Sequence, residues 1–240
     1  MQSRKLLAFC AAALALVAGV LLLVAGPGAR LGLWHFRTGF TLLRWACLGG
    51  FAAAALGLSA LAAGGLRSAP AWAGLVLGLL VAWVPLSWFR QTKAVPPIHD
   101  ITTDPANPPR FAAVLALRKD APNPPEYGGP PVAREQLRAY PDIRSLVLPS
   151  SRDAAFRNAG EAARSLGWRI VAEDAAKGTI EATDTTFWFG FKDDVVIRVV
   201  AAADGRSIVD VRSVSREGRS DVGTNARRIR AFLAKLREMP

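Results

Sequence analysis

The sequence predicts an α+β membrane protein, with three N-terminal transmembrane helices followed by a domain with a four-stranded antiparallel sheet and two helices packed on one face. Three observations support this class. The first 90 residues contain long apolar runs and no acidic residue, later segments alternate apolar with polar residues, and two helical patterns flank those segments. We therefore divide the chain into a membrane domain over 1–90, a proline-rich extended segment over 91–139 and an α+β domain over 140–240.

Three uncharged apolar runs, at about 6–26, 45–66 and 71–89, are each long enough to cross the hydrocarbon core of a bilayer. Gly74 and Gly78 form a small-xxx-small pair in the third run, which permits close packing of helices. No ionisable residue lies deep within a run, so the usual sequence marker of an ion path or a transported substrate is missing. The membrane lipid bilayer is thus the first predicted partner.

The net charge of +11 is divided unevenly along the chain. Residues 1–90 hold seven of the 30 basic residues and none of the 19 acidic ones, so the remainder carries 23 − 19 = +4. The basic residues of the first part flank apolar runs, and those of the second part are interleaved with carboxylates. Because a nucleic-acid site needs basic residues gathered on one surface, we predict no nucleic-acid partner.

The basic residues also bear on membrane orientation. Arg4 and Lys5 precede the first run, and the first span often sets the orientation of those that follow. They favour a cytoplasmic N-terminus, and three spans then put the C-terminal domain outside the cytoplasm. A count of the basic residues that flank all three runs leans slightly towards a cytoplasmic C-terminal domain, because of the basic residues at 30 to 44 and at 90 and 93.

Ten of the sixteen prolines lie between Gln91 and Pro131, and this composition predicts an extended segment without long helices or central strands. The segment contains His99, Asp100 and Asp104, which could contribute to a metal or acid–base site. A short edge strand or a turn with side-chain hydrogen bonds explains the same residues, and we prefer that interpretation.

The α+β domain is predicted from periodicity and turn residues. Amphipathic patterns indicate helices over 152–166 and 222–238, the second beginning at Asp221 as its N-cap. Alternation predicts strands over 168–173, 179–189, 193–200 and 207–216, with Asp204-Gly205 as the hairpin turn between the last two.

If both helices cover the apolar face of the sheet, the opposite face displays arginines beside the start of the second helix. Guanidinium groups near a helix N-terminus can bind an anion, such as a lipid headgroup or the carboxylate of an envelope partner. The candidate anion-site residues are Arg198, Arg212, Arg216, Arg219, Asn225 and Arg228. The competing interpretation is that the arginines pair with Asp194, Asp210 and Glu181 across strands, while Asp221 caps the helix.

The run Phe187–Phe191 contains four aromatic residues, which suit either a bilayer interface or packing at the ends of strands. The motifs of common enzymes are missing, because the sequence has no nucleophile elbow, phosphate-binding loop or histidine pair. We therefore favour a binding or assembly module. A hydrolase or metal-dependent enzyme that uses His99 and nearby carboxylates is one alternative, and a structural scaffold is another.

Several sequence blocks occur in a characteristic order between Pro96 and about Leu236. The blocks are Ile98–Asp104, Asn107–Phe111, Tyr140–Ile143, Gly167–Trp168, Ile180–Thr183, Trp188–Asp194, Asp210–Arg216 and Gly218–Arg230. Together they resemble the domain of unknown function 1499 family, and Leu31–Phe40 resembles the membrane region of its longer bacterial members. The resemblance implies a bacterial envelope protein, with relatives in plastids, and implies that Ile98–Asp104 belongs to the folded domain. With three predicted spans, we expect an inner-membrane protein. It supplies no established activity, cofactor or catalytic residue.

Overall fold

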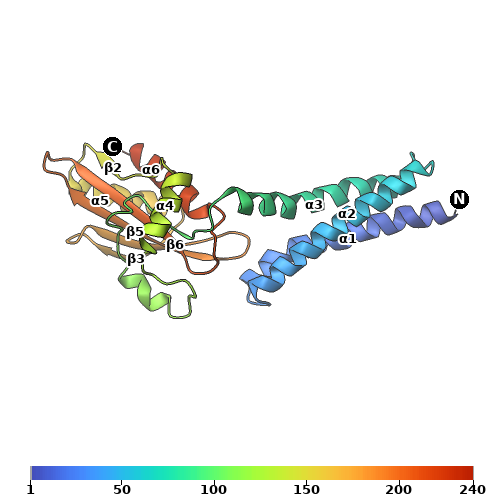
Figure 1. Ribbon diagram of the computed structural model, residues 1–240, viewed down its shortest axis with the longest axis horizontal. Coiled ribbons are helices and arrows are strands. Elements are labelled where there is room, and N and C mark those ends of the chain that lie inside the picture. The colour runs from blue at the N-terminus through green and yellow to red at the C-terminus, as the bar shows by residue number, and fades with distance from the viewer. Residues whose placement is uncertain (1, 240) are drawn as a thin grey trace. The chain divides into compact units, whose positions relative to one another are not determined.

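The computed structural model describes residues 2–239 (Figure 1). The chain forms two compact units. The first contains the residues up to Lys93 together with Phe187–Gly190, and the second contains Ala94–Thr186 and the residues from Phe191 onward. The boundary between the units falls after Lys93, and residues 94–139 belong to the same unit as the sheet.

The first unit consists mainly of three long helices, α1 (Gln2–Arg30), α2 (Phe36–Ala62) and α3 (Ala69–Ala94). Helices α1 and α3 contain the first and third predicted apolar runs, and α2 covers the second run up to Ala62 rather than to residue 66. Each helix is long and apolar enough to cross a membrane. Pro85 lies inside α3, where a transmembrane helix tolerates proline. The described part of the chain therefore has three candidate membrane spans, as the sequence predicts.

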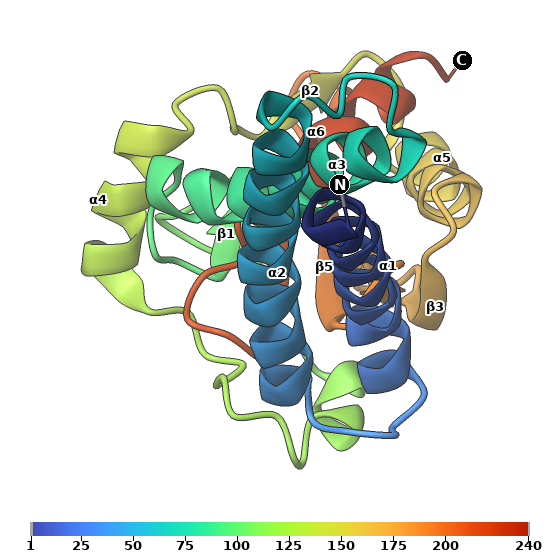
Figure 2. The same cartoon turned by 90° about the vertical axis from the view of Figure 1, so that its right-hand side faces the viewer.

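Helices α1, α2 and α3 are seen along the bundle in Figure 2, and glycines allow them to approach closely. A Cβ atom on Gly78 of α3 would lie 2.5 Å from the carbonyl oxygen of Gly50 in α2. A Cβ atom on Gly74 would lie 2.5 Å from the Cβ of Ala11 in α1. The predicted small-xxx-small pair therefore lies where helices pack, because only a hydrogen in place of a side chain permits this backbone separation.

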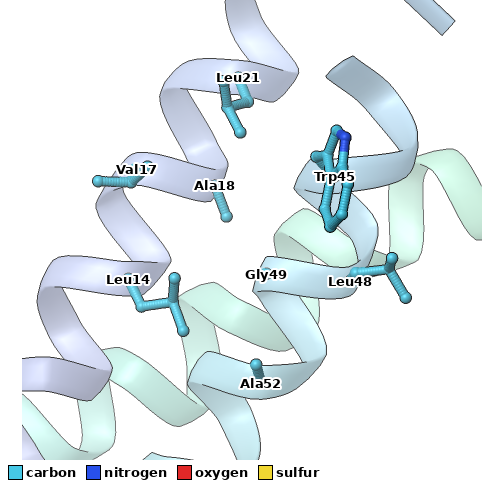
Figure 3. A pocket seen from close by; sticks show the side chains of 8 residues that line it. All are labelled: Leu14, Val17, Ala18, Leu21, Trp45, Leu48, Gly49 and Ala52. Carbon is cyan, nitrogen blue, oxygen red and sulfur yellow. The ribbon is translucent and has the colours of Figure 1, made fainter. Parts of the chain in front are cut away.

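An apolar groove of about 410 Å³ lies between α1 and α2 (Figure 3). Its lining residues are Leu14, Val17, Ala18, Leu21, Trp45, Leu48, Gly49 and Ala52. None of them carries a charge, so the groove suits apolar chains rather than a polar ligand.

The second unit is built on a six-stranded antiparallel sheet. The strands are β1 (Asp100–Thr102), β2 (Leu146–Leu148), β3 (Arg169–Asp174), β4 (Thr179–Thr185), β5 (Lys192–Ala201) and β6 (Ser207–Ser215). Their order is β1-β6-β5-β4-β3, and β2 also pairs with β6. The two short strands occupy successive parts of the same edge, since β1 pairs with Arg212–Val214 and β2 with Ser207–Val209.

The prediction of four strands was therefore wrong in number. The four predicted strands correspond to β3 to β6, although β4 ends at Thr185 rather than at Phe189. Strand β1 is a short edge strand, in agreement with the interpretation preferred for His99, Asp100 and Asp104, but it was not counted among the four. Strand β2 was missed because three residues cannot establish an alternating pattern, and it forms by pairing with a distant partner.

The helices of this unit are α4 (Gly129–Ala139), α5 (Arg152–Ser165) and α6 (Thr224–Arg237), with a 3₁₀ helix η1 at Ala113–Leu117. Helices α5 and α6 correspond to the two predicted helices, but the prediction of only two helices was wrong in number. The N-cap of α6 is Gly223 rather than the predicted Asp221. Helix α4 and η1 lie in the segment that we expected to be extended. Pro130 and Pro131 are compatible with α4 because they lie in its first turn, where their missing N–H groups have no helical partner.

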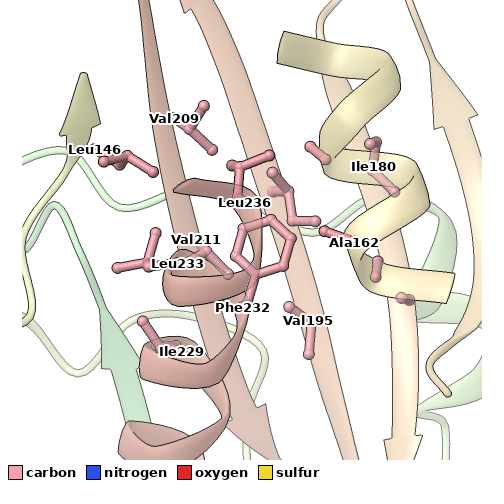
Figure 4. Close-up of a cluster of buried hydrophobic side chains, with 14 of the residues drawn as sticks. Leu146, Ala162, Ile180, Val195, Val209, Val211, Ile229, Phe232, Leu233 and Leu236 are labelled. Atoms are coloured by element: carbon pink, nitrogen blue, oxygen red, sulfur yellow. The ribbon is translucent and has the colours of Figure 1, made fainter. Parts of the chain in front are cut away.

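Helices α5 and α6 cover one face of the sheet with an apolar core (Figure 4). Phe232 of α6 is fully buried and stacks on Trp168 with ring centroids 5.3 Å apart. From β5, Val195, Ile197 and Val199 point into this core, and all three are completely buried.

The opposite face, which we call the polar face, is covered by the segment that leads from β1 to η1. Phe111 and Val114 pack on Val196 and Val214 in a second, smaller apolar cluster. Glu181 of β4 accepts hydrogen bonds from the backbone N–H groups of residues 112, 113 and 114, each at 2.9 Å. These bonds satisfy the first N–H groups of η1 and anchor the proline-rich segment to the sheet.

Candidate functional site

The candidate anion-site residues come from two neighbouring strands and from the chain that follows them. Arg198 lies on β5, Arg212 on β6, Arg216 directly after β6, Arg219 in the loop beyond, and Asn225 and Arg228 at the start of α6. The structure brings most of these residues to internal carboxylates rather than to a common open pocket.

Arg212 is 2% exposed at the polar face, and protein groups surround it. Its Nε and Nη2 donate to the two carboxylate oxygens of Asp100 at 2.9 and 2.7 Å. Nη1 and Nη2 also donate to the carbonyl oxygens of Pro109 and Pro125, at 3.2 and 2.7 Å. Burial raises the pKa of Asp100, although the hydrogen bonds from Arg212 oppose that rise. Arg212 therefore binds the proline-rich segment to β6.

Two aromatic rings complete the surroundings of this ion pair. The Arg212 guanidinium carbon lies 5.0 Å from the ring centroid of Phe111 and 5.5 Å from that of Tyr127. Burial, followed by the charge of Asp100, raises the pKa of Tyr127 to about 12. The buried Tyr127 hydroxyl has no hydrogen-bond partner among the described residues. The rings shield the ion pair from water, which strengthens the attraction between its charges.

Asp194 of β5 forms the second internal centre of charge. Arg216 donates to its two carboxylate oxygens at 2.9 and 2.8 Å, and Arg118 donates at 2.6 Å. The hydroxyl of Thr183 donates to the same carboxylate at 2.7 Å. Burial alone would raise the pKa of Asp194, but the hydrogen bonds from Arg216, Thr183 and Arg118 outweigh it and lower that pKa.

Arg198 bridges two more carboxylates at the other end of the polar face. Its Nη2 donates to Asp104 at 2.9 Å and to Asp210 at 2.7 Å. Its Nη1 donates to the carbonyl oxygen of Asn107 at 2.9 Å. Like Arg212, Arg198 connects a strand to the segment that covers it.

Arg228 and Asn225 connect the start of α6 to the sheet. Arg228 donates to Asp184 and Asp193, each at 2.7 Å, and to the side-chain oxygen of Asn225 at 2.6 Å. Asn225 donates in turn to the carbonyl oxygen of His99 at 2.9 Å. Burial would lower the pKa of Arg228, but the charges of Asp193 and Asp184 raise it. The guanidinium is therefore a fixed, paired cation.

Arg219 differs from the other candidate residues because its side chain is exposed and has no hydrogen bond or ion pair within the described chain. It lies in the loop Arg216–Val222, in which Gly218 and Val222 have positive φ angles of 91° and 53°. The Nδ1 atom of His99 lies 3.4 Å from the carbonyl oxygen of Arg219. The loop thus holds one available guanidinium outside the internal ion pairs.

Asp221 occupies the start of α6, two residues before the N-cap position held by Gly223. Its carboxylate accepts from the backbone N–H of Gly223 at 3.0 Å and from that of Asn225 at 2.5 Å. Burial raises the pKa of Asp221 despite these two hydrogen bonds. A side-chain carboxylate therefore fills the helix start at which the sequence suggested a bound anion.

His99, Asp100 and Asp104 are not brought together. Asp100 binds Arg212 within the polar face, Asp104 binds Arg198, and His99 lies against the loop at Arg219. His99 lies just before β1, which begins at Asp100. Within residues 2–239, no group of three or more His, Cys, Asp or Glu side chains has the geometry of a metal site.

Sequence reasoning identified the cations and missed most of their partners. Asp194 and Asp210 were among the cross-strand partners considered, whereas Asp100, Asp104 and Arg118 lie in the segment treated as extended. The signal that could have revealed these partners is the presence of Asp100 and Asp104 in a proline-rich segment, since such carboxylates can pair with arginines of the sheet.

The fold and this site define a class of protein: three candidate membrane spans joined to an α+β domain with internally paired arginines. The chain belongs to the DUF1499 family, because the model described as "Protein of unknown function (DUF1499)" matches residues 100–236. The match begins at β1 and ends in α6, so it includes the segment that covers the polar face. No curated protein matches the chain.

Proposed function

We propose that this protein is a binding or assembly module held at a membrane surface, in which the loop Arg216–Val222 contacts an anionic group such as a lipid headgroup. The observation that carries the proposal is the contact between this loop and the chain that leaves α3. Ser220 donates to the carbonyl oxygen of Pro96 at 3.4 Å, and the Asp221 N–H donates to that of Ile98 at 3.3 Å.

These contacts limit the distance between the loop and the membrane. Helix α3 ends at Ala94, and the four residues to Ile98 span at most roughly 14 Å when extended. Arg219 therefore lies within a short reach of the last residue of a candidate membrane span. An exposed guanidinium this close to the end of a membrane span can pair with the phosphate of a lipid headgroup. A carboxylate on an envelope protein is the other partner of suitable charge.

The test uses the full chain in lipid nanodiscs, made either of phosphatidylcholine alone or of phosphatidylcholine with phosphatidylglycerol. We expect slower amide hydrogen exchange over 216–222 in the anionic nanodiscs, and we expect Arg219→Ala to remove the difference. Arg206→Ala, in the exposed β5–β6 hairpin, is the matched control. Equal exchange in both lipids would contradict headgroup binding and favour a protein partner.

A structural scaffold is the second candidate function. It is favoured by the internal pairing of Arg198, Arg212, Arg216 and Arg228, which serves rigidity rather than recognition. Under this alternative, Arg219→Ala would leave every lipid and partner interaction of the folded protein unchanged.

We further propose that the protein resides in a bacterial inner membrane, with the α+β domain outside the cytoplasm, as Arg4 and Lys5 favour. A single cysteine at Asp204, which is exposed in the β5–β6 turn, tests the orientation in a Cys10→Ala and Cys47→Ala background. We expect a membrane-impermeant thiol reagent to label intact cells. Labelling only after lysis would show instead that the α+β domain lies in the cytoplasm.

A further inference from the structure

The apolar groove between α1 and α2 opens outward from the first unit (Figure 3). Trp45 and Leu48 line it and are 58% and 51% exposed. Leu21 and Trp45 lie at one end of the groove, and Leu14 and Ala52 lie at the other. Because both helices are candidate membrane spans, an open apolar groove along them faces the acyl chains of a bilayer.

A stripe of arginine leads from this groove towards the start of α2. Arg44 precedes the lining residue Leu48 by four positions, and Arg37 precedes Arg44 by seven. In a helix with about 3.6 residues per turn, these spacings put all three residues on one side of α2. Both arginines are exposed, and neither side chain has a hydrogen-bond or ion-pair partner within residues 2–239. The groove therefore has two available cations beside its Trp45 end.

The first unit has no carboxylate that could neutralise these cations. None of the 19 acidic residues lies in 1–93 or in 187–190, which together make up this unit. A guanidinium close to the hydrocarbon core is costly unless a counter-charge accompanies it. The counter-charge available beside a membrane span is the phosphate of an anionic lipid, which arginine can bind through two parallel N–H···O bonds.

We propose that the groove and the two arginines form a site for one anionic glycerophospholipid, with an acyl chain between α1 and α2 and the phosphate between Arg37 and Arg44. The seven positions between the arginines correspond to about 10 Å along the helix, a gap that two extended arginine side chains can close around one phosphate. Trp45 lies where the headgroup meets the chain, a level at which indole rings are favoured. The site belongs to the first unit alone, so it is separate from the loop at Arg219.

Charge selects this occupant over two others. A zwitterionic lipid offers the same chain and phosphate, but its ammonium group cancels the charge that would neutralise the guanidiniums. A second copy of the chain could fill the groove with a helix, but its first unit would add arginines and no carboxylate. An anionic lipid satisfies both the apolar groove and the cations.

The test uses the fluorescence of Trp45 in the full chain, taken as the difference between wild type and Trp45→Phe. The proteins are reconstituted in two kinds of vesicle with equal mole fractions of chain-brominated lipid. One contains brominated phosphatidylglycerol in unlabelled phosphatidylcholine, and the other contains brominated phosphatidylcholine in unlabelled phosphatidylglycerol. Bromine on an acyl chain quenches only tryptophans that the chain contacts, so the two vesicles report which lipid occupies the groove.

Two variants examine the two parts of the site, each with a matched control. Arg37→Gln combined with Arg44→Gln removes the cations, and Arg67→Gln makes the same change at an exposed position after the far end of α2. Ala52→Phe fills the groove, and Ala13→Phe adds the same ring at an exposed position of α1 outside the lining. The unfolding temperature of each variant verifies that it folds.

We expect brominated phosphatidylglycerol to quench Trp45 several-fold more strongly than brominated phosphatidylcholine. The double arginine variant should lose this preference, and Ala52→Phe should weaken quenching by both lipids. Both controls should behave like the wild type.

Equal quenching of wild-type Trp45 by the two lipids would overturn the proposal. Absence of quenching by either lipid would also overturn it and would indicate that a protein helix fills the groove. Amide exchange over 216–222 does not enter this measurement, so the lipid site and the proposed headgroup contact of Arg219 can fail independently.

Discussion

At the scale of single residues, the domain is notable for carboxylates that are buried together with arginines. Asp194 has a side chain that is 0% exposed and is held by Arg118 and Arg216. Removing one partner from such a group leaves an uncompensated buried charge, which costs far more than the loss of a surface ion pair. Residues of this kind therefore stabilise the position of one segment against another.

Asp194→Asn tests this directly. We expect the variant to lower the free energy of unfolding by about 3–5 kcal/mol at neutral pH, because two guanidinium groups lose their carboxylate. The pKa of Asp194 lies below its ordinary value of 3.8 in the folded protein. Its stabilising contribution is thus complete above pH 3.8 and is lost as the pH falls through the lower folded pKa.

Chemical denaturation of both proteins at a series of pH values measures that contribution. The difference in stability between wild type and Asp194→Asn should narrow as the pH falls below 3.8. A difference that stays constant across this range would contradict a folded-state pKa of Asp194 below 3.8.

The Asp100–Arg212 pair predicts a non-additive result. Arg212→Met alone should cost about 3–5 kcal/mol, since Asp100 would remain buried without its cation. Adding Asp100→Leu removes the stranded charge, so the double variant should be more stable than Arg212→Met. A double-mutant cycle by denaturant titration measures this coupling, and simple addition of the two single costs would contradict it.

At the scale of elements, the membrane helices depend on backbone contact at glycine. Gly78 faces the backbone of α2, whereas a Cβ on Gly19 of α1 would meet only Val81 Cγ2 at 3.7 Å, an ordinary van der Waals distance. The two glycines therefore differ in how much room a methyl group would find.

Gly78→Ala and Gly19→Ala form a matched pair of substitutions. We expect Gly78→Ala to destabilise helix packing by about 1–3 kcal/mol, because the new methyl group overlaps the Gly50 carbonyl. Gly19→Ala should have little effect. Thermal unfolding of the full chain in detergent compares them, and equal shifts in melting temperature would argue against close α2–α3 contact.

At the scale of the whole molecule, the second unit contains both apolar clusters of the sheet and the segment that covers the polar face. We therefore expect its folding to need residues before 140, the position at which the sequence analysis begins the α+β domain. Two fragments of the chain, one beginning at residue 94 and one at residue 140, distinguish between these two starting points of the domain.

A fragment over 94–240 should unfold cooperatively, because it retains β1, η1 and the partners of Arg198 and Arg212. A fragment over 140–240 should not, because it loses Asp100, Asp104 and Arg118 and exposes the polar face. Denaturant titration followed by circular dichroism measures the cooperativity. Equal cooperativity in both fragments would show that residues 94–139 are not required for folding of the α+β domain.

The sequence by itself determined the local features of this protein. The membrane spans follow from run length, because bilayer thickness sets the number of apolar residues required. Strands β3 to β6 and helices α5 and α6 follow from periodicity, because a buried face imposes its own spacing on each element. The arginines of the candidate site were recognisable as residue types for the same local reason.

Only the tertiary structure decided which group each arginine contacts. Asp100 and Arg212 are 112 positions apart, and nothing in the pattern around either residue specifies the other. Strands β1 and β2 and the cover over the polar face likewise exist through pairing with distant chain. Long-range contacts of this kind depend on how the elements pack together, so periodicity cannot predict them. The fold therefore decided that Arg219, in the loop Arg216–Val222, keeps an exposed guanidinium outside the internal ion pairs.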